Sequence, residues 1–237
     1  MTKPVILTGV RSNAEPTLGN MLGAVLPMVR MQQRHAGEYQ VNVFMPDLHS
    51  ITTPTRYEEL YSATLQNVRL FIAAGLDVKN ADTLIYRQSH VAAHAELAWI
   101  IDCFIHYGEL KRMTQFKDKS GNSDTISGGL FNYPALMAAD ILLYDANYVP
   151  VGEDQRQHLE LTRDVAIRMN HQFGKLFTIP EPWDKQLEFI GGTAGVRIRS
   201  LKHPEQKMSK SVADPAGTVL LTDDPKTAYA KINGQLP

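Results

Sequence analysis

The stretch that decides the fold is PVILTGVRSNAEPTLGNMLGAVLPMVRMQQRHAGEYQVNVFMPD, residues 4–47. It begins with a short apolar run, Pro4–Thr8, that ends at a glycine, which is typical of a buried strand. Apolar residues then recur at helical spacing over residues 18–36, and the glycine that follows suits a helix C-terminus. A second apolar run at residues 41–45 precedes a proline. The order strand, helix, strand predicts two parallel strands joined by a helix.

The rest of the chain continues this alternation and then becomes more helical. Helical periodicity over residues 56–74 and an apolar run at residues 83–87 add a helix and a strand. The pattern therefore predicts a parallel sheet wound with helices. Beyond residue 87 we expect helices at 92–106, 134–144 and 153–173, a strand at 148–151, β-like structure at 190–201, loops at 111–127 and 207–217, and a last helix opened by Asp223, Asp224 and Pro225.

Composition and charge exclude several classes of protein. Hydrophobic residues make up 43% and charged residues 21% of the 237 residues, which is ordinary for a globular protein. No apolar run is long enough for a membrane span or a secretory signal, and a single cysteine, Cys103, excludes an internal disulfide, so we expect a cytosolic protein. The net charge is -1, so a nucleic-acid partner would need a local basic patch. His90 and His94 have the spacing of a metal-binding pair but no third ligand, and we expect no metal site built by the protein.

Two short motifs suggest phosphate chemistry. Thr17-Leu18-Gly19-Asn20 follows the first strand, where helix N–H groups and the helix dipole favour phosphate; Thr17 and Asn20 would supply donors. The alternative is an ordinary helix cap followed by a tight glycine. Lys207-Met208-Ser209-Lys210-Ser211 forms a cationic loop that can follow a polyphosphate, although a lysine pair alone is usually a solvated surface.

These motifs resemble the two signatures of class I aminoacyl-tRNA synthetases, and Thr17–Asn20 has the form typical of bacterial tryptophanyl enzymes. Residues 133–144 resemble the amino-acid pocket helix of the tryptophanyl family, and residues 149–155 resemble its nucleotide-side helix. The tyrosyl family typically has Gln at the position of Met137 and Gly at that of Glu153, so the resemblance favours tryptophan.

Two segments depart from the family pattern. Arg11-Ser12-Asn13-Ala14 stand where Gln-Pro-Ser-Gly is typical, and Val212 stands where an Asp usually follows the second signature. We therefore expect differences in the contacts near the substrate.

Asp140 lies in the most apolar helical stretch of the chain and needs a donor partner if it is buried. From the residues alone, it is either a structural ion pair or cap, or a ligand-binding group. The resemblance implies that Asp140 accepts the indole N–H of tryptophan, with Tyr133, Met137 and Gln155 in the same pocket. Asp47 and His49, after the second strand, either border this site or form a surface turn.

The resemblance implies further site residues on the nucleotide side. Catalytic roles fall to Thr17, Asn20, Lys119, Lys207 and Lys210, and ATP contacts to Arg11, Ser12, Asn13, Gly19, Asn20, Gly152, Glu153, Asp154, Ile198, Lys207, Met208, Ser209, Lys210 and Ser211. The alternative for Lys119 is a solvated loop lysine.

The resemblance implies a doubly wound α/β, Rossmann-like catalytic domain over residues 1–237 with a helical insertion near 88–130. It implies that the protein activates L-tryptophan with ATP and Mg²⁺, transfers it to tRNA(Trp) and forms a homodimer through the apolar helix around Trp99 and Phe104. The helical domain that reads the anticodon in such enzymes is expected to be largely absent, because few cations follow Lys210. The alternatives are a tyrosyl-type enzyme and a non-catalytic, synthetase-like regulatory protein.

Overall fold

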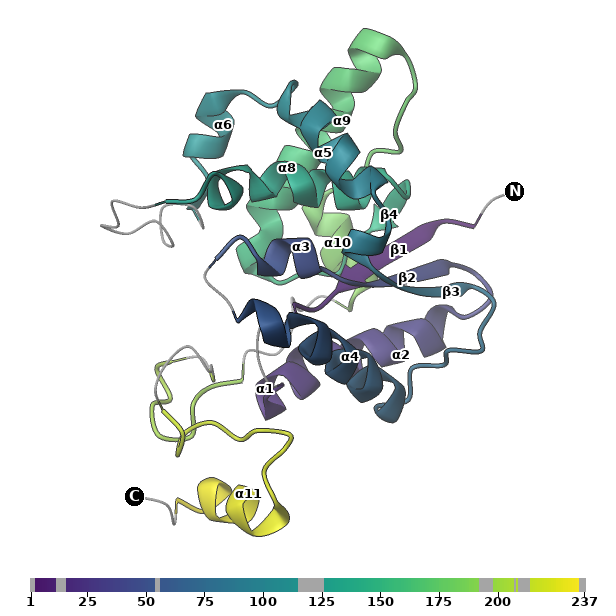
Figure 1. The fold of residues 1–237 in the computed structure, drawn as a ribbon. Helices are drawn as coiled ribbons and strands as arrows, with labels where there is room; N and C mark the ends of the chain where they lie inside the picture. The colour runs from purple at the N-terminus through teal and green to yellow at the C-terminus, as the bar shows by residue number, and fades with distance from the viewer. Residues whose placement is uncertain are drawn as a thin grey trace.

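The structure is a computed structural model that describes residues 3–11, 16–53, 56–114, 126–191, 198–206, 208 and 214–234. Its centre is a four-stranded parallel sheet in the order β3-β2-β1-β4 (Figure 1). The strands are β1 (Val5–Gly9), β2 (Gln40–Met45), β3 (Thr83–Arg87) and β4 (Ala146–Tyr148). The chain runs from β1 to one side of the sheet and later returns to the other side. This is the doubly wound order that the sequence predicted, and ligands bind such sheets where the winding reverses.

Helices connect and cover the strands. They are α1 (Leu18–Asn20), a π-helical turn (Met21–Val25), α2 (Leu26–His35), α3 (Asp47–Ser50), α4 (Tyr57–Ala73), the 3-10 turn η2 (Gln88–His90), α5 (Ala93–Asp102), α6 (Tyr107–Lys111), α8 (Gly128–Leu142), the 3-10 turn η3 (Glu153–Gln155), α9 (Arg156–Phe173), α10 (Trp183–Phe189) and α11 (Pro225–Ile232). Of the helices in the described ranges, none combines the length and the apolar character that a membrane span requires.

The alternation of side chains along β1 builds two cores. Ile6 faces α2 and α4 and packs with residues such as Val43 and Phe71. Leu7 faces the opposite side and packs with Ile141 and other residues around α8, α9 and α10. Figure 1 shows α2 and α4 on one side of the sheet and α5, α8 and α9 on the other. A third apolar cluster joins α5, α6, α8 and α9 to one another, so this helical layer is held together independently of the strands.

Several element boundaries differ from the sequence prediction. The predicted helix at 134–144 begins at Gly128, because the Ser127 Oγ accepts the Leu130 N–H at 3.1 Å and caps the helix before Pro134. The predicted strand at 148–151 is instead Ala146–Tyr148, and the apolar residues after it line a cavity. The predicted helix at 18–36 contains a π-helical turn, where Pro27 lacks the N–H that a regular helix would use.

The prediction also missed the short helices α3, α6 and α10. The short helix α6 lies where the sequence predicted the boundary between a helix and a loop. The helix α10 was not predicted, and its Trp183 side chain is buried in the core below β4. The remainder of the predicted 111–127 loop beyond residue 114 falls mostly outside the described residues.

Candidate active site

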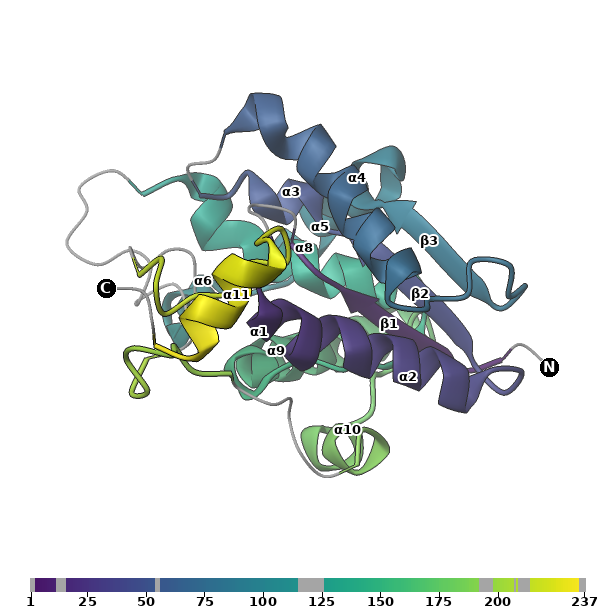
Figure 2. The same cartoon turned by 90° about the horizontal axis from the view of Figure 1, so that it is seen from below.

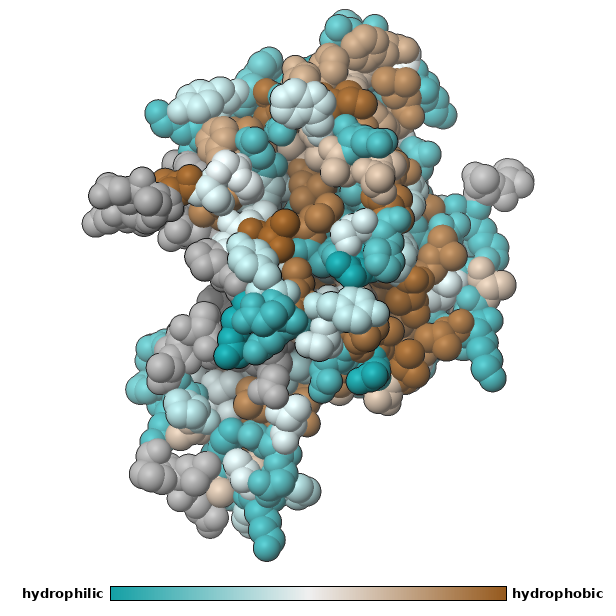
Figure 3. Space-filling model, in the orientation of Figure 1, coloured by the Kyte–Doolittle hydropathy of each residue, from teal (hydrophilic) through white to brown (hydrophobic). Residues whose placement is uncertain are grey.

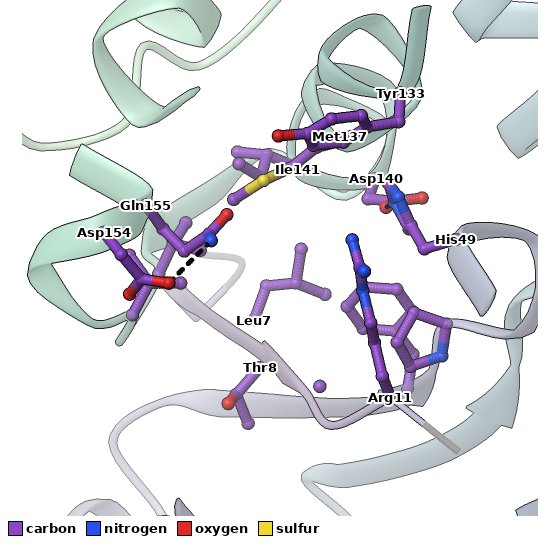
Figure 4. A pocket seen from close by; sticks show the side chains of 15 residues that line it. Leu7, Thr8, Arg11, His49, Tyr133, Met137, Asp140, Ile141, Asp154 and Gln155 are labelled. Atoms are coloured by element: carbon purple, nitrogen blue, oxygen red, sulfur yellow. Dashed lines mark hydrogen bonds and ion pairs between the residues drawn. The ribbon is translucent and has the colours of Figure 1, made fainter. Parts of the chain in front are cut away.

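A cavity of about 570 Å³ opens at the carboxyl ends of β1 and β2 and beside the segment after β4, where the winding of the sheet reverses (Figure 4). Most of its lining is apolar. It is lined by Leu7, Thr8, Gly9, Arg11, Phe44, Pro46, His49, Tyr133, Met137, Asp140, Ile141, Val149, Val151, Asp154 and Gln155. Six of the residues expected at the site, Arg11, Tyr133, Met137, Asp140, Asp154 and Gln155, therefore line one cavity.

The end of β1 requires a glycine where it approaches β2. A Cβ atom at Gly9 would lie 2.7 Å from the backbone oxygen of Phe44 and 2.9 Å from the ring of the same residue. No side chain fits in that space, so the glycine allows the two strands to carry the cavity floor at their normal spacing.

Asp140 is the most deeply buried charged group at the cavity, with 1% of its surface exposed. Its Oδ2 accepts a hydrogen bond from the Nε2 of His49 at 2.7 Å. Its Oδ1 accepts one from the Gln88 Nε2 at 2.7 Å and one from the His94 Nδ1 at 2.6 Å. Burial opposes ionisation of this carboxyl group, but His49 and His94 reverse the effect and hold the pKa of Asp140 below its ordinary value. Asp140 is therefore a carboxylate with the donor partners that its apolar helix requires.

His49 and Asp47 are both buried, which contradicts the surface-turn alternative. His49 lines the cavity and lies beside Asp140 in Figure 4. Asp47 accepts hydrogen bonds from the side chain of Arg87, at 2.5 Å, and from the backbone and hydroxyl of Ser89. Burial opposes ionisation, but these donors keep the pKa of Asp47 below its ordinary value. The Asp47 contacts tie the end of β2 to the end of β3 and so fix the positions of His49 and Gln88.

The helix α8, which carries Asp140, also contributes Tyr133 and Met137 to the cavity wall. The Tyr133 hydroxyl lies 2.6 Å from the Nε2 of His158 on α9. Burial is the main cause that raises the pKa of Tyr133 to about 12. The guanidinium carbon of Arg11 lies 6.0 Å from the centre of the Tyr133 ring, and Figure 4 shows the Arg11 side chain extending into the cavity. Arg11 thus places a positive charge at the cavity.

The turn after β4 supplies the polar end of the cavity. The Gln155 Nε2 donates to the Asp154 Oδ2 at 3.2 Å (Figure 4). A Cβ atom at Gly152 would lie 2.6 Å from the Asp154 Oδ1, so the glycine allows this carboxylate to fold back over the turn. Glu153 points elsewhere: it is exposed, it pairs with Arg156 at 3.5 Å, and it does not line the cavity.

The Thr17–Asn20 turn is a reciprocal helix cap. The Thr17 Oγ1 accepts the Asn20 N–H at 3.1 Å, and the Asn20 Oδ1 accepts both the N–H and the hydroxyl of Thr17 at 2.9 and 3.0 Å. The alternative of a helix cap is therefore correct as a description of local structure. It is compatible with ligand binding, because Oδ1 faces Thr17 and the amide Nδ2 of Asn20 is left to face away from the cap.

The turn is joined to the region of the second signature. The Leu18 N–H donates to the Val219 carbonyl at 2.9 Å and the Leu221 N–H to the Pro16 carbonyl at 3.0 Å, which forms an antiparallel bridge between Thr17 and Leu220. Figure 2 views the molecule from below, where α11, which follows this segment, overlaps α1, and Figure 1 shows α11 below α1 and separate from it.

Gly19 lies beside Ile198 and Met208. A Cβ atom at Gly19 would lie 3.5 Å from the Cβ of Ile198 and 3.6 Å from that of Met208, and the Met208 N–H donates to the Ile198 carbonyl at 3.0 Å. Five of the expected nucleotide-side residues thus lie together around the turn, namely Thr17, Gly19, Asn20, Ile198 and Met208. The expected residues Ser12, Asn13, Lys119, Lys207, Ser209, Lys210 and Ser211 lie outside the described residues.

Sequence reasoning missed Gln88 and His94 as partners of Asp140, and it missed the apolar lining from the strand ends. The lining residues share a signal, since Leu7, Phe44 and Val149 all lie at or just after the carboxyl end of a strand. His94 was considered only as a metal ligand. In the described part of the chain, no group of three or more His, Cys, Asp or Glu side chains is arranged to hold a metal ion.

The comparisons with known proteins agree with this geometry. The chain is 50% identical over 227 residues to a tryptophan–tRNA ligase of Caldanaerobacter subterraneus subsp. tengcongensis, which covers 96% of this chain and 65% of that protein. Its fold is similar to tryptophanyl-tRNA synthetase from Mycoplasma pneumoniae, with a TM-score of 0.81 and 36% identity over 98% of this chain and 65% of that one. It is also similar to the Campylobacter jejuni enzyme in complex with ADP and tryptophan, with a TM-score of 0.80 and 32% identity over 98% of this chain and 67% of that one.

The chain spans about 65% of the length of the first two of these relatives. The sequence pattern of the family described as tRNA synthetases class I (W and Y) matches residues 1–235. By this match and by its fold, the chain belongs to the class I tRNA synthetase family of tryptophanyl and tyrosyl enzymes.

Proposed function

We propose that this chain activates L-tryptophan with ATP, forms tryptophanyl-adenylate and pyrophosphate, and then transfers the tryptophan to tRNA(Trp). The observation that carries the proposal is the cavity, in which one buried carboxylate, Asp140, stands in a largely apolar lining. Indole is a flat apolar ring with a single N–H donor and is complementary to such a cavity. A buried acceptor left unpaired strongly disfavours amino acids that lack the donor.

The rest of the cavity suits the body of the amino acid. Met137 and Ile141 offer apolar side chains to the ring, and Tyr133 closes the same wall. Gln155 supplies polar atoms for the amino-acid backbone, and Arg11 supplies positive charge where the α-carboxylate meets the α-phosphate.

The nucleotide binds next to the amino acid, against the Thr17–Asn20 turn. The Asn20 amide, held by Thr17, donates to a phosphate oxygen, and Gly19 lies beside Ile198 and Met208 on this side of the site. Gly152, Glu153 and Asp154 lie at the ribose and base side. Supporting this placement, a relative 32% identical to this chain has been crystallised with ADP and tryptophan.

In the activation step, a carboxylate oxygen of tryptophan attacks the α-phosphorus of ATP, and the bond from that phosphorus to the pyrophosphate oxygen breaks. The step needs no protein nucleophile, so positioning and electrostatic stabilisation carry it. Lys119, Lys207 and Lys210 stabilise the negative charge that collects on the departing pyrophosphate.

The oxygen ligands that the described residues offer fit a Mg²⁺ ion that arrives bound to ATP better than one held by the protein alone. Mg²⁺ usually binds through substrate phosphates with one or two carboxylates. At the cavity the described residues offer an acidic oxygen at Asp154, and they contain no cluster of three metal ligands. When bound, the ion neutralises phosphate charge.

The proposal extends to partners and setting. The enzyme would work in the cytosol on tRNA(Trp) and would form a homodimer. Trp99, Ile100 and Tyr107 are exposed by 72%, 47% and 67% on the outer helical layer, which supports an interface there, whereas Phe104 packs inward against Phe173. Figure 3 shows apolar residues over this upper layer, while the part around α11 is mostly hydrophilic.

The test is ATP–pyrophosphate exchange with each of the twenty amino acids in turn. We expect exchange that depends on tryptophan and is much slower with tyrosine. Equal or faster exchange with tyrosine would assign the chain to the tyrosyl type. No exchange with any amino acid, by a chain that binds tryptophan, would support a non-catalytic binding protein.

A further inference from the structure

Three side chains outside the cavity are hydrogen-bonded, directly or through another side chain, to the Asp140 carboxylate that lines it. Asp140 and His49 line the cavity, but Gln88, His94 and Tyr144 do not. All three nevertheless connect to Asp140, two of them directly and Tyr144 through His94. They act on a ligand only through Asp140, which makes them candidates for positioning residues.

The orientation of the Gln88 amide is fixed by the chain. Its Oε1 accepts the backbone N–H of Leu48 at 3.1 Å, and an N–H group can only donate. The Nε2 of Gln88 therefore faces the Oδ1 of Asp140, at 2.7 Å, and donates to it. Gln88 is 0% exposed, so water cannot replace it.

His94 holds the same oxygen from a second direction. Its Nδ1 lies 2.6 Å from the Asp140 Oδ1 and its Nε2 lies 2.9 Å from the Tyr144 hydroxyl. Because a carboxylate only accepts, Nδ1 carries the proton. The ring is fully buried and is held by hydrogen bonds at both of its nitrogens.

The hydrogen-bond count then leaves one acceptor position. A carboxylate offers about two lone-pair sites on each oxygen. The two donors from Gln88 and His94 fill Oδ1, and the His49 Nε2 takes one site on Oδ2 at 2.7 Å. The remaining site is on Oδ2, the oxygen that His49 holds, and both His49 and Asp140 line the cavity.

We propose that Gln88 and His94 are positioning residues that fill Oδ1 of Asp140 and so leave Oδ2 as the single charged acceptor for the N–H group of the substrate ring. The inference rests on the proposed function and adds that selection of the N–H donor is set by residues that never touch the substrate. Without these two donors, the carboxylate would be free to rotate or to take up a proton, and the acceptor would be lost.

The experiment compares tryptophan with β-(benzothiophen-3-yl)alanine, in which sulfur replaces the ring N–H. Calorimetry on the whole chain gives both dissociation constants. A hydrogen bond to a charged acceptor corresponds to a preference of about tenfold to hundredfold for tryptophan in the wild-type protein. Gln88→Met is expected to reduce this preference by about tenfold, through weaker binding of tryptophan, while binding of the analogue changes by no more than about twofold.

Gln32→Met is the matched control. Gln32 is also buried, with 1% exposed, and it hydrogen-bonds to the backbone of Asp77 and the hydroxyl of Thr83, away from the cavity. Both substitutions delete the hydrogen bonds of a buried glutamine. Only Gln88→Met should change the preference for tryptophan, whereas both should lower the melting temperature.

A second pair separates donation from packing at His94. His94→Asn places an amide Nδ2 close to the position of Nδ1 and restores a donor to Asp140, whereas His94→Leu has none. We expect the Asn variant to keep most of the preference and the Leu variant to lose it. If His94→Leu does not fold, the binding preferences of His94→Asn, Gln88→Met and Gln32→Met still test the positioning role.

The outcomes are distinct. Variants that keep the wild-type preference, or that weaken tryptophan and the analogue equally, would overturn the positioning role and leave the proposed function intact. A wild-type protein that binds neither compound, or that shows no preference, would refute the proposed function and this inference with it.

Discussion

Replacing Asp140 with Asn tests whether the buried charge stabilises the fold. The carboxylate accepts three hydrogen bonds at 2.6–2.7 Å, and two of their donors, Gln88 and His94, are fully buried. A hydrogen bond to a charged group is worth roughly 1.5–3 kcal/mol, against about 0.5–1.5 kcal/mol for a neutral one. An Asn side chain has one acceptor oxygen in place of two, so its NH2 group faces a donor at the other position and at least one of the three bonds is lost, while the others become neutral. We therefore expect Asp140→Asn to lower the free energy of unfolding by about 3 kcal/mol or more at pH 7.

The pH dependence gives the stronger test of the same change. The pKa of Asp140 is lowered in the folded protein, so its contribution to stability is present above the unfolded pKa and is lost as pH falls through the folded pKa. Urea unfolding followed by circular dichroism should show the full difference between wild type and variant at pH 7 and pH 5. The difference should begin to shrink below a pH of about 4, where Asp140 of the unfolded chain takes up a proton, and should be lost only below the lowered pKa of the folded protein.

A surface carboxylate provides the control. Asp164 on α9 is exposed, and Asp164→Asn should change the free energy of unfolding by no more than about 0.5 kcal/mol at any of these pH values. An Asp140→Asn variant as stable as wild type at pH 7 would show that the three hydrogen bonds do not stabilise the fold. A difference that persists undiminished at pH 2.5 would show that the charge is not its cause.

Three further changes test the site. Gly9→Ala should cost about 1–3 kcal/mol in thermal unfolding and weaken tryptophan binding, because its Cβ would lie 2.7 Å from the Phe44 backbone oxygen; an unaffected melting temperature would contradict the close approach. Thr17→Val should cost about 1 kcal/mol of stability and slow pyrophosphate exchange, because it removes the cap that holds the Asn20 amide, whereas unchanged exchange would separate the cap from catalysis. Lys210→Ala should slow adenylate formation in single-turnover kinetics at saturating ATP far more than it weakens ATP binding, because charge develops on the leaving group; an unchanged rate with weaker binding would place this lysine in ground-state binding.

The sequence predicted the sheet well where burial is uniform. The apolar runs of β1 and β2 are buried on both faces or nearly so, and their pattern leaves little choice of structure. The edge strand β3 is only half-buried, with Leu84 exposed by 46%, and was predicted from its short apolar run between turn residues. The strand β4 was placed too late because Val149 and Val151 are as apolar as strand residues, although they contact a cavity and not a neighbouring strand. Hydrophobicity alone does not distinguish a residue that lines a pocket from one that lies in a sheet.

The site was predicted in part for a related reason. Asp140 was visible as a carboxyl group in an apolar helix that needs a partner, and its burial with three donors confirms that need. Its partners His49, Gln88 and His94 come from three other elements between 46 and 91 residues away. Nothing local in the sequence marks a pairing between elements so far apart, so only the assembled fold shows which side chains satisfy the charge.

The bridge between Thr17 and Leu220 has a consequence for how the protein folds. These two residues are about two hundred positions apart in the sequence. Contacts of such long range form late, because closing the loop of the intervening chain costs conformational entropy before the contact contributes any stabilising free energy. During synthesis, β1, β2 and β3 can assemble while the later segment is still being made. The turn that carries Thr17 and Asn20 reaches its final setting only after residues 218–221 have been added and have docked. During synthesis, the sheet would therefore form well before the nucleotide site is complete.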